Sequence, residues 1–252
     1  MAIITLTTDF GTRDGYVGAM KGVLWRLARD CDIVDITHEI PRGDVAHAAW
    51  VVATSCREFP DDTIHIVVVD PGYAAGSARR GVVVGAHGSC YIGRDNGVFT
   101  YLEPRWARAI ENAHVMAPSV SAAFHGRDVF ATAAAAIARK IDPAIVGPQI
   151  ELEGTLPWGK RPEHEGRIVH VDHFGNLVSD LPVGEAGEAI AITGRRLAVG
   201  RSYEDVASGE LLAYVGSSRT VEIAVRDGRA DRALDAPRGT PVVPVPLGTE
   251  FR

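Results

Sequence analysis

The sequence is poor in cysteine and lysine and has no long hydrophobic run. Its three cysteines, Cys31, Cys56 and Cys90, are far apart and follow no metal-binding or disulfide spacing, which is typical of buried thiols in a reducing compartment. Lysine occurs at three of the 252 positions. No apolar stretch approaches the ~18 residues that a transmembrane helix requires. The composition therefore argues against a disulfide scaffold and against a transmembrane helix.

Charge and missing motifs exclude further classes. The net charge is −6 and the basic residues are dispersed, with no stripe of basic and aromatic residues, so we expect no nucleic-acid partner. The chain contains no P-loop, no glycine-rich dinucleotide fingerprint and no nucleophilic serine elbow. It begins directly with a strand-like pattern rather than with a basic and then apolar leader. We therefore expect a cytoplasmic protein with no membrane association.

The first 147 residues alternate between strand-like and helix-like segments. The β-branched runs and the helical periodicities follow one another as strand 3–6, helix 14–29, strand 33–36, helix 44–55, strands 64–69 and 81–85, and helix 128–141. Such alternation is typical of a layered α/β domain with a mostly parallel sheet. We therefore assign residues 1–147 to an N-terminal α/β domain.

The pattern changes after residue 147. Residues 148–166 are rich in proline and glycine, as linkers are. Beyond them, short alternating segments predict strands at 167–171, 189–192, 211–215, 220–225 and 241–245. Because these segments are separated by glycine turns and no convincing helix intervenes, residues 167–252 are predicted to form a smaller antiparallel β-barrel-like domain.

Two strands of the N-terminal domain end in an aspartate followed by a glycine turn. The run before Asp9 and the run before Asp70 both point to the carboxyl edge of the sheet, where open α/β proteins bind their ligands. Arg79 follows in the next loop, and His125 lies just before a predicted helix. A carboxylate, a guanidinium and an imidazole together can orient a water molecule. Alternatively, Asp70 caps a turn and Arg79 is a surface residue.

A second group lies at the start of the C-terminal domain, in the segment Asp172-His173-Phe174-Gly175-Asn176. An aromatic face beside an amide suits a purine, since the ring stacks and the amide reads the base edge. The alternative is a β-turn in which Phe174 fills the core of the barrel. The aspartates and histidines of both groups are acceptable metal ligands, but they lack paired ligand spacing, so we expect no metal site.

Five motifs occur here in the order found in one enzyme family. They are Thr8-Asp9-Phe10-Gly11, Asp70-Pro71-Gly72, Asp95-Asn96-Gly97, Phe124-His125-Gly126-Arg127-Asp128 and Phe174-Gly175-Asn176-Leu177. In this the chain resembles the S-adenosyl-L-methionine (SAM) hydrolases, also called SAM hydroxide adenosyltransferases, which are relatives of the fluorinases and chlorinases. The resemblance implies an α/β domain followed by a β-barrel-like domain. It also implies a reaction without a cofactor, in which water attacks the ribose C5′ of SAM and releases adenosine and methionine.

The resemblance assigns a role to each candidate residue. It implies catalytic roles for Asp70, Arg79 and His125. It implies substrate-binding roles for Phe124, for Asp9 (ribose), for Phe174 and Asn176 (adenine), and for Asp172 and Ser217 (methionine end). It further implies a homotrimer in which each site lies between the N-terminal domain of one subunit and the C-terminal domain of its neighbour.

The chain departs from the family pattern at three places. The loop after Asp70 is longer than usual, which favours Arg79 as the catalytic arginine but leaves Arg80 as a substitute. Gly216 and Arg219 stand where the family usually has asparagine and glycine. Halogenating relatives have tyrosine at the position of Asp70, whose charge repels a halide. We therefore expect SAM hydrolysis; the alternatives are a non-catalytic protein that binds adenosine or SAM, and a halide-dependent adenosyl transferase.

Overall fold

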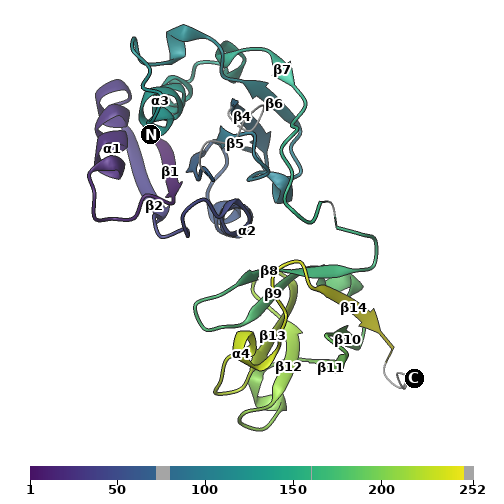
Figure 1. The fold of residues 1–252 in the computed structure, drawn as a ribbon. Coiled ribbons are helices and arrows are strands. Elements are labelled where there is room, and N and C mark those ends of the chain that lie inside the picture. The colour runs from purple at the N-terminus through teal and green to yellow at the C-terminus, as the bar shows by residue number, and fades with distance from the viewer. Residues whose placement is uncertain (72–79, 160, 247–252) are drawn as a thin grey trace. The chain divides into compact units, whose positions relative to one another are not determined.

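The computed structural model describes residues 1–71, 80–159 and 161–246, which belong to two compact units (Figure 1). The first unit spans Met1–Leu156 and the second Pro157–Arg252. Each has its own hydrophobic core. Within the described ranges, no helix is both long and apolar enough to cross a membrane.

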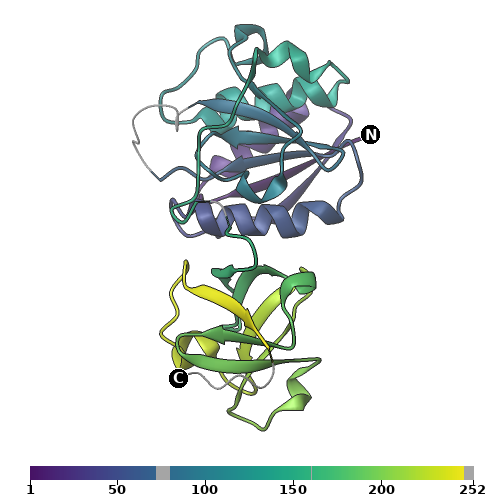
Figure 2. The same ribbon diagram turned by 90° about the vertical axis from the view of Figure 1, so that its right-hand side faces the viewer.

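A sheet forms the centre of the first unit, with helices packed against it (Figure 2). It has seven strands in the order β2-β1-β3-β5-β4-β6-β7. Its strands are β1 (Ala2–Thr8), β2 (Cys31–Thr37), β3 (Ile64–Val68), β4 (Gly81–Ala86), β5 (Ser89–Arg94), β6 (Trp106–Ala109) and β7 (Gln149–Ile150). Neighbours are parallel from β2 to β5, whereas β4, β6 and β7 each pair antiparallel with the strand before them in that order. The predicted α/β fold is confirmed, with a sheet that is parallel in one half and antiparallel in the other.

Helices cover both faces of this sheet. They are α1 (Tyr16–Leu27), α2 (Val45–Ser55), α3 (Ala131–Ala138) and the π-helix η5 (Gly126–Phe130), with short 3₁₀ turns η1 (Cys56–Glu58), η3 (Thr100–Leu102), η4 (Ala113–Val115) and η6 (Pro143–Val146). The run from strand β3 to Val69 has apolar side chains on both faces of the sheet. Ile64 and Ile66 pack into the cluster that contains residues of α1 and α3, while Val67 and Val69 pack into the cluster that contains residues of α2. The β-branched run is therefore buried on both faces, as its composition predicts.

The second unit is a closed seven-stranded barrel in the order β10-β11-β12-β13-β9-β8-β14. Its strands are β8 (Gly166–Val171), β9 (Leu177–Pro182), β10 (Ala189–Ile192), β11 (Arg195–Gly200), β12 (Leu211–Val215), β13 (Thr220–Val225) and β14 (Pro241–Val245), with the short helix α4 (Ala230–Ala233) and 3₁₀ turns η7 (Val183–Glu185) and η8 (Tyr203–Asp205). The predicted barrel is confirmed. It is antiparallel except where β11 meets β12.

Candidate active site

Asp9 and Asp70 leave the sheet at the same edge. Strands β1 and β3 are parallel neighbours with Thr8 opposite Val68, and the backbone N–H of Asp9 donates to the carbonyl of Val68 at 3.3 Å. Burial raises the pKa of Asp9, and the negative charge of Asp70 adds to that rise. The two carboxyl groups are therefore close enough to sense each other's charge, as expected for side chains at the carboxyl ends of adjacent parallel strands.

The loop before α2 packs against both aspartates. The backbone N–H of Gly43 donates to Oδ2 of Asp9 at 2.8 Å. Gly43 has φ +70°, and a Cβ at this position would lie 2.8 Å from the Cα of Pro71. A glycine is required here both by the left-handed backbone and by the close approach of the Asp70-Pro71 segment. Asp44 then caps α2 by accepting from the N–H of His47 at 3.0 Å.

His125 stands directly before the π-helix η5, which packs on the end of β3. A Cβ on Gly126 would lie 3.3 Å from the methyl groups of Val68 and 3.2 Å from the sulfur of Met20. This close fit brings His125 to the strand end that leads to Asp70. Burial lowers the pKa of His125, and the positive charge of Arg94 lowers it further. The imidazole is therefore neutral at neutral pH and able to accept a proton.

Aromatic rings surround this edge. The ring centroid of Phe124 lies 5.3 Å from that of Tyr16 and 5.8 Å from that of Phe10, in edge-to-face contacts. The guanidinium of Arg127 lies 5.0 Å from the same Phe124 centroid. Tyr16 remains 52% exposed. Phe124 is one of the candidate residues from the sequence, and Tyr16 at the start of α1 joins its ring cluster.

The arginines fall differently from expectation. Arg79 lies outside the described residues. Arg80 forms an ion pair with the buried Asp95 and donates to the carbonyl of Glu151 at 3.1 Å. Its guanidinium is therefore bound by these two residues. Within the described ranges, Arg94 forms an ion pair with Asp70, with 3.3 Å between Nη2 and Oδ2. Sequence reasoning missed Arg94, although it directly precedes a recognised motif.

The second group of predicted residues belongs to the turn between β8 and β9. The side-chain amide of Asn176 donates to Oδ2 of Asp172 at 2.8 Å, and the backbone N–H of Asn176 donates to Oδ1 at the same distance. Phe174 is 70% exposed, so the alternative in which it fills the barrel core is wrong. The exposed ring and the amide line a depression of about 630 Å³ together with Tyr203 and Arg229.

A chain of hydrogen bonds continues from Asn176 into the barrel. Its side-chain amide also donates to the hydroxyl of Tyr203 at 3.0 Å; that hydroxyl bonds to the hydroxyl of Tyr214 at 3.0 Å, and Tyr214 donates to Oε2 of Glu222 at 2.5 Å. Burial raises the pKa of Glu222. Both hydrogens of the Asn176 amide are engaged in these bonds, which leaves its carbonyl oxygen as the atom that can accept from a ligand.

The turn between β12 and β13 carries Ser217, which is exposed. A Cβ on the preceding Gly216 would lie 1.8 Å from Oε1 of Glu222, so the glycine makes room for that side chain. Arg219 has φ +60°, the left-handed conformation that a glycine adopts without strain. At the first departure from the family pattern, Gly216 leaves space for Glu222; at the second, Arg219 adopts a backbone conformation that favours glycine.

The structure thus brings together Asp9, Asp70, Phe124 and His125 in the first unit. It gathers Asp172, Phe174 and Asn176, with Ser217 in another turn, in the second unit. Among the described residues, no group of three or more histidine, cysteine, aspartate or glutamate side chains is arranged to hold a metal ion.

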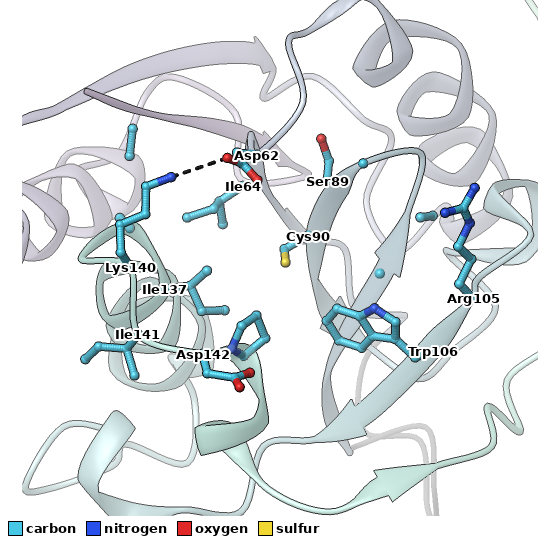
Figure 3. Close-up of a pocket in the computed structure, with 16 residues that line it drawn as sticks. Asp62, Ile64, Ser89, Cys90, Arg105, Trp106, Ile137, Lys140, Ile141 and Asp142 are labelled. Atoms are coloured by element: carbon cyan, nitrogen blue, oxygen red, sulfur yellow. Dashed lines mark hydrogen bonds and ion pairs between the residues drawn. The ribbon is translucent and has the colours of Figure 1, made fainter.

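Another cavity, of about 380 Å³, lies at the opposite edge of the first unit's sheet (Figure 3). Its lining includes Ile64 and Cys90 at the starts of β3 and β5, with the indole of Trp106 to one side. The ion pair between Lys140 and Asp62, 3.4 Å long, lies on another side. Asp9, Asp70 and His125 do not line this cavity, because the two aspartates follow the carboxyl ends of β1 and β3.

Comparisons with known proteins cover both units. The family description "SAM hydroxide adenosyltransferase N-terminal domain" matches residues 4–147, and the corresponding C-terminal domain matches residues 166–243. A protein of Thermus thermophilus named (R)-S-adenosyl-L-methionine hydrolase is 35% identical, over 96% of this chain and 99% of its own length. One of the same name from Salinispora tropica is 37% identical, over 94% of this chain and 95% of its own length.

A solved structure of an uncharacterized conserved protein from Thermotoga maritima has a TM-score of 0.82 and 29% identity, and it covers 96% of this chain and 99% of that one. A fluorinase from Actinoplanes sp. is more distant, with 26% identity over 71% of each chain. The similarity therefore extends through both units and is greater to the proteins named as hydrolases than to this halogenating enzyme.

Proposed function

The chain belongs to the SAM hydroxide adenosyltransferase family, and on that premise we propose that it is an enzyme that hydrolyses S-adenosyl-L-methionine to adenosine and methionine. Relatives that match nearly the whole chain carry the name of this activity. The observation that supports the proposal most directly is the meeting of Asp9, Asp70 and His125 at one edge of the sheet. This is where α/β proteins bind ligands.

In the proposed reaction a water molecule held by Asp70 and His125 attacks C5′ of the ribose. A C–O bond forms at C5′ while the C5′–S bond breaks, and its electron pair stays on sulfur. The positively charged sulfonium thus leaves as the neutral thioether of methionine, so no acid is needed to protonate it. What remains for the protein is to place one water in line with the breaking bond and to accept its proton, and positioning alone accounts for a large share of such a barrier.

The two groups suit different parts of this task. His125 has a lowered pKa and is neutral at neutral pH, so its ring can take the proton that the water loses. Asp70 is 41% exposed at the side chain and paired with Arg94, and in this proposal the carboxyl group also accepts from the attacking water. Arg79, outside the described residues, remains part of the proposed catalytic set because of the family resemblance.

Substrate binding divides between the two units in this proposal. The half-buried carboxyl group of Asp9 receives the ribose hydroxyls, and the Phe124 ring forms part of the wall beside them. Phe174 stacks on adenine, while the side-chain carbonyl oxygen of Asn176 accepts from the adenine amino group. Asp172 and Ser217 hold the methionine end.

The proposal extends to the assembly and setting of the enzyme. We expect it to act in the cytoplasm as a homotrimer without a metal or organic cofactor, with each site shared by the N-terminal domain of one subunit and the C-terminal domain of the next. The composition supports the first point: the three cysteines are free thiols, as is common in a reducing compartment.

The test is incubation of the purified protein with each sulfur epimer of SAM, followed by chromatography for adenosine and methionine. Equimolar release of both products, unchanged by a chelator, is expected. SAM that binds without adenosine release would replace the enzyme with the binding-protein alternative, and loss of turnover on chelation would identify a metal-dependent hydrolase. Added fluoride or chloride is expected to yield no 5′-halogenated adenosine, since the Asp70 carboxylate repels a halide.

A further inference from the structure

Arg94 lies outside the five sequence motifs, yet its side chain contacts the candidate active site. It is the last residue of β5, which runs parallel to β3, with Ile92 opposite Ile66. Its side chain is 11% exposed and its guanidinium lies 3.3 Å from the carboxylate of Asp70. A largely buried arginine needs an anionic partner to offset the loss of hydration. Asp70 supplies that charge at the rim of the candidate active site.

The same guanidinium also contacts the helix that follows His125. Its central carbon lies 5.8 Å from the ring centroid of Phe130, the last residue of η5. Arg94 therefore lies between the strand end that carries Asp70 and the helical segment that His125 precedes. From this position the Arg94 side chain can fix the distance between Asp70 and His125.

Among the described residues, three charged groups act on the imidazole of His125. Arg94 is the positive neighbour and lowers the pKa of His125, after burial, whereas Asp70 and Asp128 raise it. The charge of Asp128 is balanced by Arg127, whose Nε lies 2.6 Å from Oδ1. Asp70 itself faces Arg94, His125 and the carboxyl group of Asp9.

We propose that Arg94 is a positioning residue for SAM hydrolysis, which fixes the Asp70 carboxylate at the rim and holds a positive charge beside His125. The inference rests on the proposed function. A carboxylate fixed in this way accepts a water hydrogen bond in one direction, which is what an in-line attack on C5′ requires. The positive charge also disfavours the imidazolium form, so His125 stays ready to accept a proton.

The variant R94M removes the charge but keeps an unbranched side chain that can pack on Phe130. We expect kcat to fall by roughly tenfold or more with a smaller change in KM, because a group that acts through Asp70 affects the reacting water rather than substrate binding. The acidic limb of the pH–rate profile is expected to move to higher pH, since His125 binds a proton more readily without the positive charge of Arg94 beside it.

Two further variants separate the charge of Arg94 from its shape and from a general loss of stability. R94K restores the charge without the planar fork, so its acidic limb should return close to that of the wild type while kcat stays low. R108M is the matched control, because Arg108 lies on β6 of the same sheet and donates to the carbonyl of Gly147 at 3.0 Å. It should lower the melting temperature without moving the pH–rate profile.

A readout that needs no activity separates this inference from the proposed function. NMR titration of the His125 ring in the wild type and in R94M is expected to give a higher pKa in the variant. A folded R94M with an unchanged His125 pKa and an unchanged pH–rate profile would overturn the role of Arg94. A raised His125 pKa in a protein that does not hydrolyse SAM would support the electrostatic role of Arg94 and contradict the proposed function instead.

Discussion

At the scale of single residues, the candidate site depends on how burial and charge tune two titratable groups. Burial raises the pKa of Asp9, which accepts a backbone hydrogen bond from Gly43, while burial and Arg94 lower the pKa of His125. A carboxyl group and an imidazole that depart in opposite directions from their ordinary pKa values are typical of functional sites.

His125 gives the first prediction. Because its folded pKa lies below the ordinary value of 6.5, activity should be full near neutral pH and should fall on the acidic side with a midpoint below 6.5, as the ring takes up a proton. H125N should lose about 10²–10⁴-fold in kcat/KM together with that limb. The measurement is kcat/KM from pH 4.5 to 9. An H125N enzyme with the activity and profile of the wild type would rule out the proton-accepting role.

Arg219 gives a prediction about stability. Its φ of +60° strains a residue with a side chain, and the side chain is exposed, so R219G should stabilise the protein by about 0.5–1 kcal/mol. Thermal denaturation should show a higher melting temperature for R219G and not for the control R219A, which keeps a Cβ. An R219G melting temperature equal to that of the wild type would contradict the strain argument.

The residue scale also shows where sequence reasoning ends. Asp9, Asp70 and His125 were predictable because each sits at a strand end or directly before a helix, and those signals are local. Arg94 was not, because its significance comes from a contact with Asp70 across neighbouring strands. The sequence leaves Arg80 as a substitute for Arg79, yet in the structure the guanidinium of Arg80 pairs with Asp95.

At the scale of elements, the packing of η5 on β3 carries His125 to the site. The sequence predicts one helix at 128–141, whereas the structure has a π-helical turn at Gly126–Phe130 and then α3 at Ala131–Ala138. π-helical turns often occur at functional sites. The sequence pattern does not predict strand β9, because two of its buried residues are polar. Contacts with distant segments satisfy them: Ser179 donates to the carbonyl of Val221, and Asp180 accepts from the N–H of Arg167.

Gly126 tests the role of this packing. In G126A the new Cβ would press on Val68 and on Met20 at 3.2–3.3 Å, so η5 must shift and take His125 with it. We expect kcat to fall by about tenfold or more, since small displacements of a reacting group are costly, with a modest loss of stability.

The matched control is G22A in α1, where a Cβ meets open space. Alanine is favoured over glycine inside a helix by about 0.5–1 kcal/mol, so G22A should keep its activity and raise the melting temperature. Steady-state kinetics and thermal denaturation of both variants are the measurements. Equal kcat values in G126A and G22A would show that the fit of η5 on β3 does not position the catalytic group.

At the scale of the whole molecule, the candidate residues belong to two units with separate cores. The α/β and barrel classes followed from strand composition and turn spacing, which are local properties. The order of the barrel strands, and the parallel contact between β11 and β12, come from pairings between distant segments that no local pattern encodes. The division between Leu156 and Pro157 falls within the proline- and glycine-rich segment 148–166.

The proposed sharing of sites between subunits leads to a complementation experiment. D70N and N176A, each expected to be nearly inactive, alter different units. Co-expressed or refolded together, they should form mixed trimers in which some sites combine two unaltered domains, and activity should recover to a measurable fraction of the wild type. Simple mixing of folded trimers is the control. No recovery in mixed trimers confirmed by mass spectrometry would contradict the shared site.

The central claim is that water attacks C5′ of SAM, and an isotope experiment tests it most directly. The enzyme is incubated with SAM in ¹⁸O-labelled water and the products are analysed by mass spectrometry, with D70N as the comparison. The account predicts one ¹⁸O atom in the 5′-hydroxyl of adenosine, none in methionine, and a strongly reduced rate in D70N. Adenosine formed without the label, or formed at the wild-type rate by D70N, would contradict it.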